Sequence, residues 1–278
     1  VSTNMQISCF DPVQMQLHKL WTDPAALSND HSILPIHLSV GPDGSMWVSH
    51  PDRLLHVRGE RVDMFPFPTR SPFPQTDVVF DAAGNLFTST RKQIFTLSAA
   101  QQQAGTGAFS LLYQFSDDGI IGSTQLLMDN GGLLWIGTNG FGLRKYNPGD
   151  HRLHHYIPNR SLRRILPDRF NRVWIWYYGT FHRLDEKENK FADALQSGPG
   201  LLQHDLLERR NGEFWLLCEN TASNKQGEGL LIKINPQTFQ QEAQYPIPGR
   251  VTILSHMKED RSGKIYISGN EGKLIVFD

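Results

Sequence analysis

Six polar residues recur along this 278-residue chain at intervals that fit a structural repeat. They are His37, Asp77, Gln125, Arg164, Asp205 and His256, and the intervals between them are 40, 48, 39, 41 and 51 residues. Imidazole, carboxylate, amide and guanidinium groups all form hydrogen bonds with polar ligands, and histidine and aspartate also serve as acids, bases or metal ligands. Which chemistry they support depends on the elements that position them.

Each of these polar residues stands ten positions before the aromatic residue of a short repeated motif. The motif occurs as GSMWVS, GNLFTS, GLLWIG, NRVWIW, GEFWLL and GKIYIS, with its aromatic at Trp47, Phe87, Trp135, Trp174, Trp215 and Tyr266. A period of about 40 to 50 residues is typical of a four-stranded propeller blade. The sequence therefore predicts an all-β fold, a β-propeller of four-stranded antiparallel blades whose strands we call a to d from the inside outwards.

A tight turn precedes the aromatic in every copy. Three positions before it stand residues that tolerate a positive φ, namely Gly44, Gly84, Gly132, Asn171, Gly212 and Gly263. Six positions before it, four copies carry an aspartate (Asp81, Asp129, Asp168 and Asp260), and Gly41 and Arg209 are the exceptions. Because an aspartate can close a type I turn by accepting a hydrogen bond from the backbone two residues on, we expect an a–b hairpin in each copy.

A third strand, c, follows each motif, at residues 54–57, 94–97, 143–146, 181–184, 230–234 and 274–277. A seventh copy of strand c is predicted at 7–12, with an outer strand d at 15–21. Seven such strands predict a seven-bladed propeller whose first and last blades are incomplete, and a six-bladed ring with a spare strand is the alternative.

We expect one propeller over residues 1–278. Its parts are a partial blade at 1–22, blades at 33–66, 73–116, 122–158, 161–195 and 201–246, and a partial blade at 251–278. Because both partial blades supply a strand c, they cannot merge into one blade, and we expect a fragment of a longer chain.

The six polar residues are predicted to line one end of the blades, where each strand a begins. The next residue is apolar in every copy: Leu38, Val78, Leu126, Ile165, Leu206 and Met257. The b–c loops lie at the same end and add Tyr177, Tyr178 and Phe141, whose rings suit the apolar C–H faces of a sugar. Trp176 shares the face of Trp174 and is expected in the core. We predict that these six polar residues and three loop aromatics bind a ligand, although a solvated channel mouth would also be polar.

The run from Asp129 to Tyr146 resembles the repeat of the two-component regulator propeller family. It reads D-x-x-G-x-L-W-I-G-T followed by G-L-x-x-Y, and the resemblance extends more weakly over all 278 residues. That family forms the periplasmic sensor region of hybrid two-component system histidine kinases and commonly recognises oligosaccharides. The resemblance implies a periplasmic, non-catalytic sensor segment, with the kinase elsewhere in the full-length protein and the remaining blades and domains of that chain as partners.

Two other classes of function remain alternatives. One is a scaffold for protein interaction or a homodimer. The other is an enzyme similar to the streptogramin lyases, which share short motifs like GPDGSMW, with His37, His204 and His256 meeting across a channel. Groups two or three blades apart are expected to be too distant for direct contact, and neither G-x-S-x-G nor H-E-x-x-H is present.

Composition excludes some partners. The formal net charge is -1, and lysine and arginine are scattered, so the sequence predicts no nucleic-acid partner. No apolar run approaches the roughly 20 residues that span a bilayer, so this segment is expected to make no membrane contact. No cofactor or metal is predicted.

Overall fold

The structure, a computed structural model, describes most of the chain. It covers residues 6–11, 13–14, 16–22, 38–49, 53–68, 78–90, 93–115, 123–162, 164–252, 255–268 and 274–278. The chain divides into two compact units. The first unit comprises Val1–Ile136 with Lys145–Leu153, and the second comprises Gly137–Arg144 with His154–Asp278.

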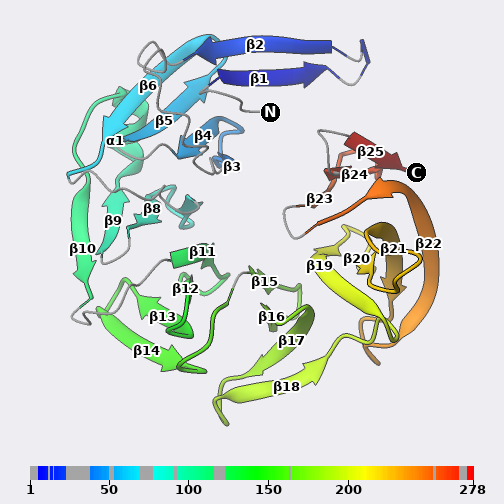
Figure 1. Ribbon diagram of the computed structural model, residues 1–278. Coiled ribbons are helices and arrows are strands. Elements are labelled where there is room, and N and C mark those ends of the chain that lie inside the picture. Colours follow the sequence, from blue (N-terminus) through cyan, green and yellow to red (C-terminus); the bar gives the residue numbers. More distant parts are fainter. Residues whose placement is uncertain are drawn as a thin grey trace. The chain divides into compact units, whose positions relative to one another are not determined.

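The first unit begins with a two-stranded sheet and continues with four-stranded sheets (Figure 1). The two-stranded sheet contains β1 (Gln6–Asp11) and β2 (Gln16–Thr22). The next two sheets contain β3 (Leu38–Val40), β4 (Met46–Ser49), β5 (Arg53–Arg58) and β6 (Arg61–Pro66), and then β7 (Val79–Phe80), β8 (Leu86–Ser89), β9 (Gln93–Leu97) and β10 (Ser110–Gln114). The division between the units runs through the following sheet, which contains β11 (Ser123–Met128), β12 (Leu134–Thr138), β13 (Leu143–Asn147) and β14 (Arg152–Tyr156).

The second unit contains three further sheets. The first two contain β15 (Arg164–Pro167), β16 (Val173–Tyr177), β17 (Thr180–Asp185) and β18 (Lys190–Ala194), and then β19 (Leu201–Glu208), β20 (Phe214–Asn220), β21 (Glu228–Ile234) and β22 (Gln241–Arg250). The last contains β23 (Met257–Glu259), β24 (Ile265–Ser268) and β25 (Leu274–Phe277). Successive strands in these sheets pair antiparallel, as predicted.

The number of blades differs from the prediction. Within the described residues, six sheets carry the repeat aromatic on their second strand, so this part of the chain forms six blades, not seven. The seventh predicted strand c, β1, does pair with its outer strand β2, but the two form a sheet of their own. Because this c–d pair stands without an a–b hairpin among the described residues, counting copies of strand c overestimated the number of blades.

The a–b turn has the same backbone hydrogen bond and the same positive φ in all six blades. The residue three before the aromatic has a positive φ in each, and its N–H donates to the carbonyl three residues earlier. The four aspartates accept from the backbone two residues on, as predicted, and Asp129 and Asp168 also accept from the indole N–H of Trp135 and Trp174, at 2.8 and 2.9 Å. In these two blades one carboxylate thus closes the turn and also binds the repeat aromatic.

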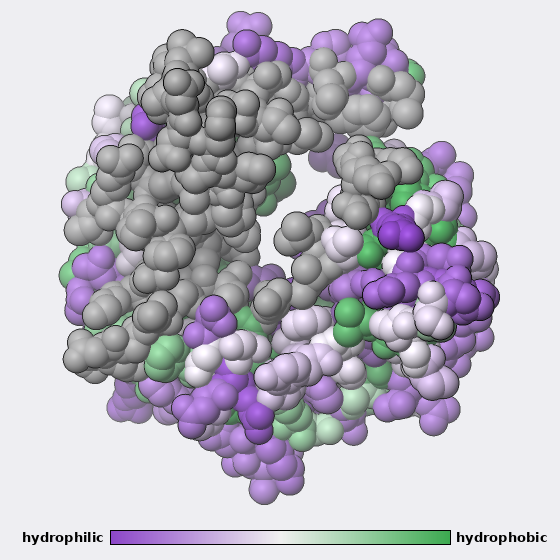
Figure 2. All heavy atoms as spheres, in the orientation of Figure 1, coloured by the Kyte–Doolittle hydropathy of each residue, from purple (hydrophilic) through white to green (hydrophobic). Residues whose placement is uncertain are grey.

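The repeat aromatics form the inter-blade cores. Trp174 packs with Phe214 and Leu216 of the next blade, and Trp215 packs with Ile265 of the last one. Trp176 is also buried, as expected. These strands are apolar on both faces because neighbouring sheets cover both faces. The space-filling view shows that hydrophilic residues cover much of the described outer surface of the second unit (Figure 2).

The predicted apolar position after each polar residue is buried in five of the six blades. Val78, Leu126, Ile165, Leu206 and Met257 all have exposures of 6% or less. Leu38 is the exception at 55%. The predicted burial of the apolar position is therefore confirmed in five blades and wrong in the blade that contains β3.

Two arginines link the turns of adjacent blades in the second unit through hydrogen bonds, and we call each set of bonds a hook. The backbone N–H and Nε of Arg169 donate to the carboxylate of Glu208 at 2.8 and 2.6 Å. One blade later, the backbone N–H of Arg210 donates to Glu259 at 2.9 Å, and its Nη1 donates to the carbonyl of Asp260 at 2.8 Å. In each hook the earlier blade donates and the later blade accepts.

A short helix that was not predicted, α1 (Ala99–Ala104), lies between β9 and β10. Ser98 caps its first turn, Gln101 completes a capping box, and Gly105 ends it with a left-handed conformation. This S-x-x-Q pattern followed by glycine is a helix signal that could have been recognised within an all-β repeat.

Candidate functional site

Three of the predicted polar residues lie together in the second unit. Arg164 begins β15, Asp205 lies in β19, and His256 directly precedes β23, so three consecutive blades each supply one. His37 and Asp77 lie outside the described residues. Gln125 is partly buried on β11, in the first unit. The structure therefore describes one cluster, Arg164 with Asp205 and His256.

Asp205 is the buried centre of this cluster. Its side chain is 6% exposed, and its Oδ1 accepts from Nη1 of Arg164 at 2.9 Å and from the backbone N–H of Leu206 at 3.0 Å. Its Oδ2 accepts from the backbone N–H of Met257 at 2.7 Å. Three donors thus surround the carboxylate, and it joins β15, β19 and the start of β23.

Arg164 also reaches His256, two blades away. Its Nη1 lies 2.7 Å from Nδ1 of His256, and its Nη2 lies 3.1 Å from Nε2. The expectation that groups two blades apart are too distant for contact is therefore wrong for this pair, because the long arginine side chain spans the intervening blade. The Arg164 side chain is 13% exposed and that of His256 is 58% exposed. The cluster presents an imidazole and part of a guanidinium to solvent above a buried carboxylate.

A β-bulge places a second histidine beside this cluster. The pairing of β19 with β20 shifts between Gln203 and Asp205, which leaves His204 at the bulge. His204 is buried, and its Nε2 lies 2.8 Å from Oε2 of Glu219. Within the described part of the chain its Nδ1 has no hydrogen-bond partner.

Glu219 and the carbonyl of Ser255, which accepts from Nη2 of Arg164 at 3.3 Å, were not predicted. Three successive polar residues, Gln203 to Asp205, interrupt the alternation of the strand, and that signal could have revealed the bulge. A backbone carbonyl leaves no mark in the sequence.

The three predicted loop aromatics differ in their exposure to solvent. Tyr178 is 83% exposed and adopts a φ of 45°, an unusual conformation for a bulky residue. Tyr177 is only partly exposed because its ring packs edge-to-face on Tyr178, with centroids 4.5 Å apart, and against Phe191 at 5.1 Å. Phe141 is partly buried in its own loop. Since Trp176 pairs with Arg164, Tyr178 lies at the same end of its blade as Arg164.

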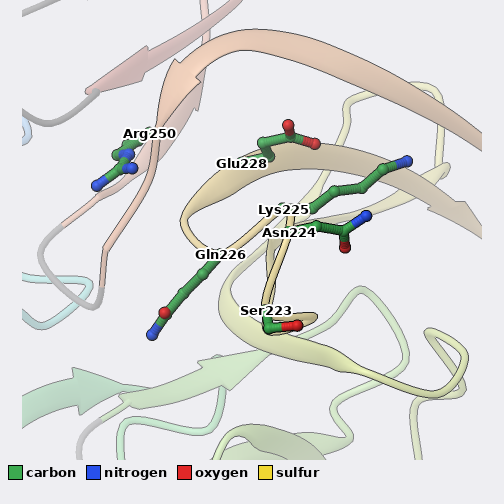
Figure 3. A pocket seen from close by; sticks show the side chains of 6 residues that line it. All are labelled: Ser223, Asn224, Lys225, Gln226, Glu228 and Arg250. Carbon is green, nitrogen blue, oxygen red and sulfur yellow. The ribbon is translucent and has the colours of Figure 1, made fainter.

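A polar pocket lies at the long b–c insertion of the blade formed by β19 to β22. Its volume is about 370 Å³, and it is lined by Ser223, Asn224, Lys225, Gln226, Glu228 and Arg250. Figure 3 shows that the side chains of Lys225 and Gln226 point away from each other. Because its lining groups diverge and none belongs to the cluster, we place the candidate site at Arg164, Asp205 and His256.

A serine and a histidine are also in contact in the first unit, where Oγ of Ser45 lies 2.7 Å from Nε2 of His56. His56 is buried and stacks on Trp47 with ring centroids 4.0 Å apart. An enclosed pair of this kind is not accessible to a substrate, and it stabilises the blade instead.

Acidification from pH 7.5 to pH 5 is expected to lower the melting temperature. Burial is the main cause that lowers the pKa of His56, His182 and His204 below the ordinary value of 6.5. The unfolded chain therefore binds more protons than the folded chain below about pH 6.5, so stability is present above that pH and is lost as the pH falls. Carboxylate protonation acts at lower pH, since the ordinary carboxyl pKa values are 3.8 and 4.5.

Melting curves at both pH values test this expectation. His204→Gln should reduce the difference between them, whereas His154→Gln, at an exposed position on β14, should not. An equal difference in the two variants would show that burial of His204 does not contribute.

Among the described residues, no group of three or more histidine, cysteine or acidic side chains is placed to hold a metal ion. Within the same residues, no helix has the length and apolar character that crossing a membrane requires.

No family model and no curated protein sequence matches the chain. Among solved structures, the chain is similar to the extracellular domain of the hybrid two-component system BT4673 from B. thetaiotaomicron, with 17% sequence identity and a TM-score of 0.65. It is also similar to the extracellular domain of BT3049 from the same organism, with 13% identity and a TM-score of 0.63. The matches cover 87% and 88% of this chain but 33% of each of those chains, so it spans about a third of their length. A third similar structure is the dihydro-heme d1 dehydrogenase NirN, with 14% sequence identity and a TM-score of 0.63. That match covers 99% of this chain and 60% of NirN.

At these identities the likeness establishes the fold alone. The chain has a β-propeller fold, as predicted. The resemblance to the two-component regulator propeller family is confirmed at this level, because extracellular domains of two-component systems are among the neighbours. Propellers with enzymatic roles are also among them.

Proposed function

We propose that this chain is a ligand-sensing segment of an extracytoplasmic, periplasmic propeller in a two-component signalling protein. The observation that carries the proposal is the convergence of Arg164, Asp205 and His256 from three consecutive blades. Binding groups held by a rigid scaffold at the ends of strands are typical of ligand sites. The neighbours, which are extracellular domains of two-component systems, support the sensor role.

The ligand we propose is an oligosaccharide. Arg164 supplies donors for the polar groups of the ligand, and Tyr178 supplies an exposed ring for the apolar face of a sugar at the same end of the blade. The chain itself is proposed to be non-catalytic, since His204, the histidine beside the cluster, is enclosed and already engaged by Glu219.

A thermal-shift screen against a panel of oligosaccharides tests the proposal. A ligand that binds only the folded state raises the melting temperature, by an amount that corresponds to about 2.7 kcal/mol at one hundred times its Kd. We expect a shift with one class of glycan, and we expect Tyr178→Ala to reduce it.

Phe170→Ala is the matched control, because Phe170 is also an exposed aromatic but lies in the a–b turn at the opposite end of the same sheet. If no glycan shifts the melting temperature, or if both variants reduce the shift equally, the oligosaccharide site proposed here is wrong. The absence of any thermal shift would favour a scaffold for protein interaction.

A further inference from the structure

The side chain of His256 occupies the fork of Arg164. The two terminal guanidinium nitrogens face the two ring nitrogens, with Nη1 to Nδ1 at 2.7 Å and Nη2 to Nε2 at 3.1 Å. Bidentate contact of this kind is the geometry in which arginine binds a carboxylate, through two parallel N–H···O bonds. The imidazole therefore lies where the two oxygens of a carboxylate would lie.

The imidazole is a poor partner at this position. A neutral imidazole has one acceptor nitrogen and one N–H, whereas every guanidinium nitrogen is a donor. His256 can accept from Arg164 at one ring nitrogen only, and the other contact sets two N–H groups against each other. Protonation of the ring would leave no acceptor at all. A carboxylate offers acceptors at both positions and adds the opposite charge.

The fork stays in place without the imidazole. Asp205 holds Nη1 at 2.9 Å, and the carbonyl of Ser255 accepts from Nη2 at 3.3 Å. Each terminal nitrogen carries two hydrogens, so each keeps one for a ligand. Asp205 is buried and bonded to three donors, so its charge is already compensated and it orients the guanidinium. Its Oδ2 lies 3.8 Å from Nδ1 of His256, which is beyond hydrogen-bond reach of the place that a ligand oxygen would take.

His256 is placed to move out of the fork. Its backbone is fixed to β24, because its N–H donates to Oγ of Ser268 at 2.8 Å and its carbonyl accepts from the N–H of Ser268 at 2.9 Å. The side chain is 58% exposed, so a change of rotamer carries the ring into solvent while the strand stays in place.

We infer that the ligand carries a carboxylate, which displaces His256 and takes the fork of Arg164. This inference rests on the proposed function and names the chemical group of the ligand that the proposed site binds. His256 acts as a latch: it fills the fork in the unliganded chain and reduces the apparent affinity by the fraction of molecules in which it is closed. The carboxylate could belong to an acidic sugar or to another small acid, and the two sources are distinguishable.

Isothermal titration calorimetry with three probes tests the latch. The probes are sodium D-glucuronate, D-glucose and N-acetylalanine, at constant ionic strength and on the 278-residue chain. We expect glucuronate to bind more tightly than glucose, and His256→Ala to bind glucuronate about tenfold more tightly than the wild type. Arg164→Lys, which keeps the charge opposite Asp205 but has no fork, should bind glucuronate about tenfold more weakly. His154→Ala, at an exposed position, should match the wild type.

The probes separate the outcomes. Equal binding of N-acetylalanine and glucuronate would support a site that reads the carboxylate alone, and tighter binding of glucuronate would support an acidic sugar. If His256→Ala binds glucuronate no more tightly than the wild type, or does not bind it, the latch is wrong, even if neutral oligosaccharides stabilise the chain as proposed above. If carboxylates bind as expected but no oligosaccharide produces a thermal shift, the latch stands and the oligosaccharide proposal fails.

Discussion

Replacing Asp205 with alanine is expected to lower the free energy of unfolding by about 3–5 kcal/mol, the range for breaking a buried ion pair by removing one partner. The substitution leaves the guanidinium of Arg164 largely buried without its carboxylate. It also removes the acceptor of the N–H of Met257, whose residue is buried at the start of β23. The cost comes from the groups left behind, since a buried charge or donor without a partner is penalised more than the bond itself contributes.

Urea unfolding followed by tryptophan fluorescence measures this change. The matched control is Asp193→Ala, which removes an aspartate that pairs with Arg183 at the surface and should cost less than about 1 kcal/mol. The double variant Arg164→Leu with Asp205→Ala should be less destabilised than the sum of the two single variants, because removing both ions leaves neither one buried alone. Additive effects, or a cost for Asp205→Ala as small as that of the control, would contradict the buried network.

The second large effect is expected at Gly142, in the loop between β12 and β13. Its φ is 78°, and a Cβ there would lie 2.3 Å from the carbonyl oxygen of Ile157 and 2.5 Å from that of Tyr156. These are backbone atoms, so no side chain can rotate away to make room. The Gly142 N–H also donates to the carbonyl of Arg160 at 2.8 Å, which holds the two segments together. Strain and overpacking together should cost Gly142→Ala about 2–5 kcal/mol.

Gly140→Ala provides the comparison within the same loop. Gly140 has a φ of 95°, but nothing lies within 4 Å of the position of its Cβ. That variant therefore carries the strain of the positive φ alone, about 1–2 kcal/mol. Denaturation of both variants should separate the contribution of close packing from that of backbone strain. Equal destabilisation would mean that the segment containing Ile157 can move aside.

The repeat predicted the blades because its signals are local. Asp129 and Gly132 define a turn within four residues, and Trp135 marks the strand that follows, so spacing alone places strands a and b. The same locality explains the error in blade number. The segment that became β1 resembles a strand c in its own residues, and no local signal shows that its sheet has only two strands.

The spacing of the repeat also predicted the polar residue at the start of each strand a, but it did not predict the hydrogen-bond partners of that residue. Register along strand a identified Arg164, Asp205 and His256 as equivalent residues. That two of them touch across an intervening blade depends on the length of the Arg164 side chain and on backbone donors such as the N–H of Met257. Those contacts are tertiary, and periodicity carries no information about them.

The hooks between blades have a direction that follows the chain. Arg169 reaches forward to Glu208, and Arg210 reaches forward to Glu259, so each turn is held by the blade that comes after it. Each hook joins one pair of adjacent blades, and Arg164 adds a contact that passes over a blade, from β15 to His256 beside β23. A pulling force that detaches the sheet of β23 to β25 would break the bonds of Arg210 to Glu259 and, in the same step, the contacts of Arg164 with Ser255 and His256. Loss of the last sheet would thus remove contacts from both of the blades that precede it in the second unit.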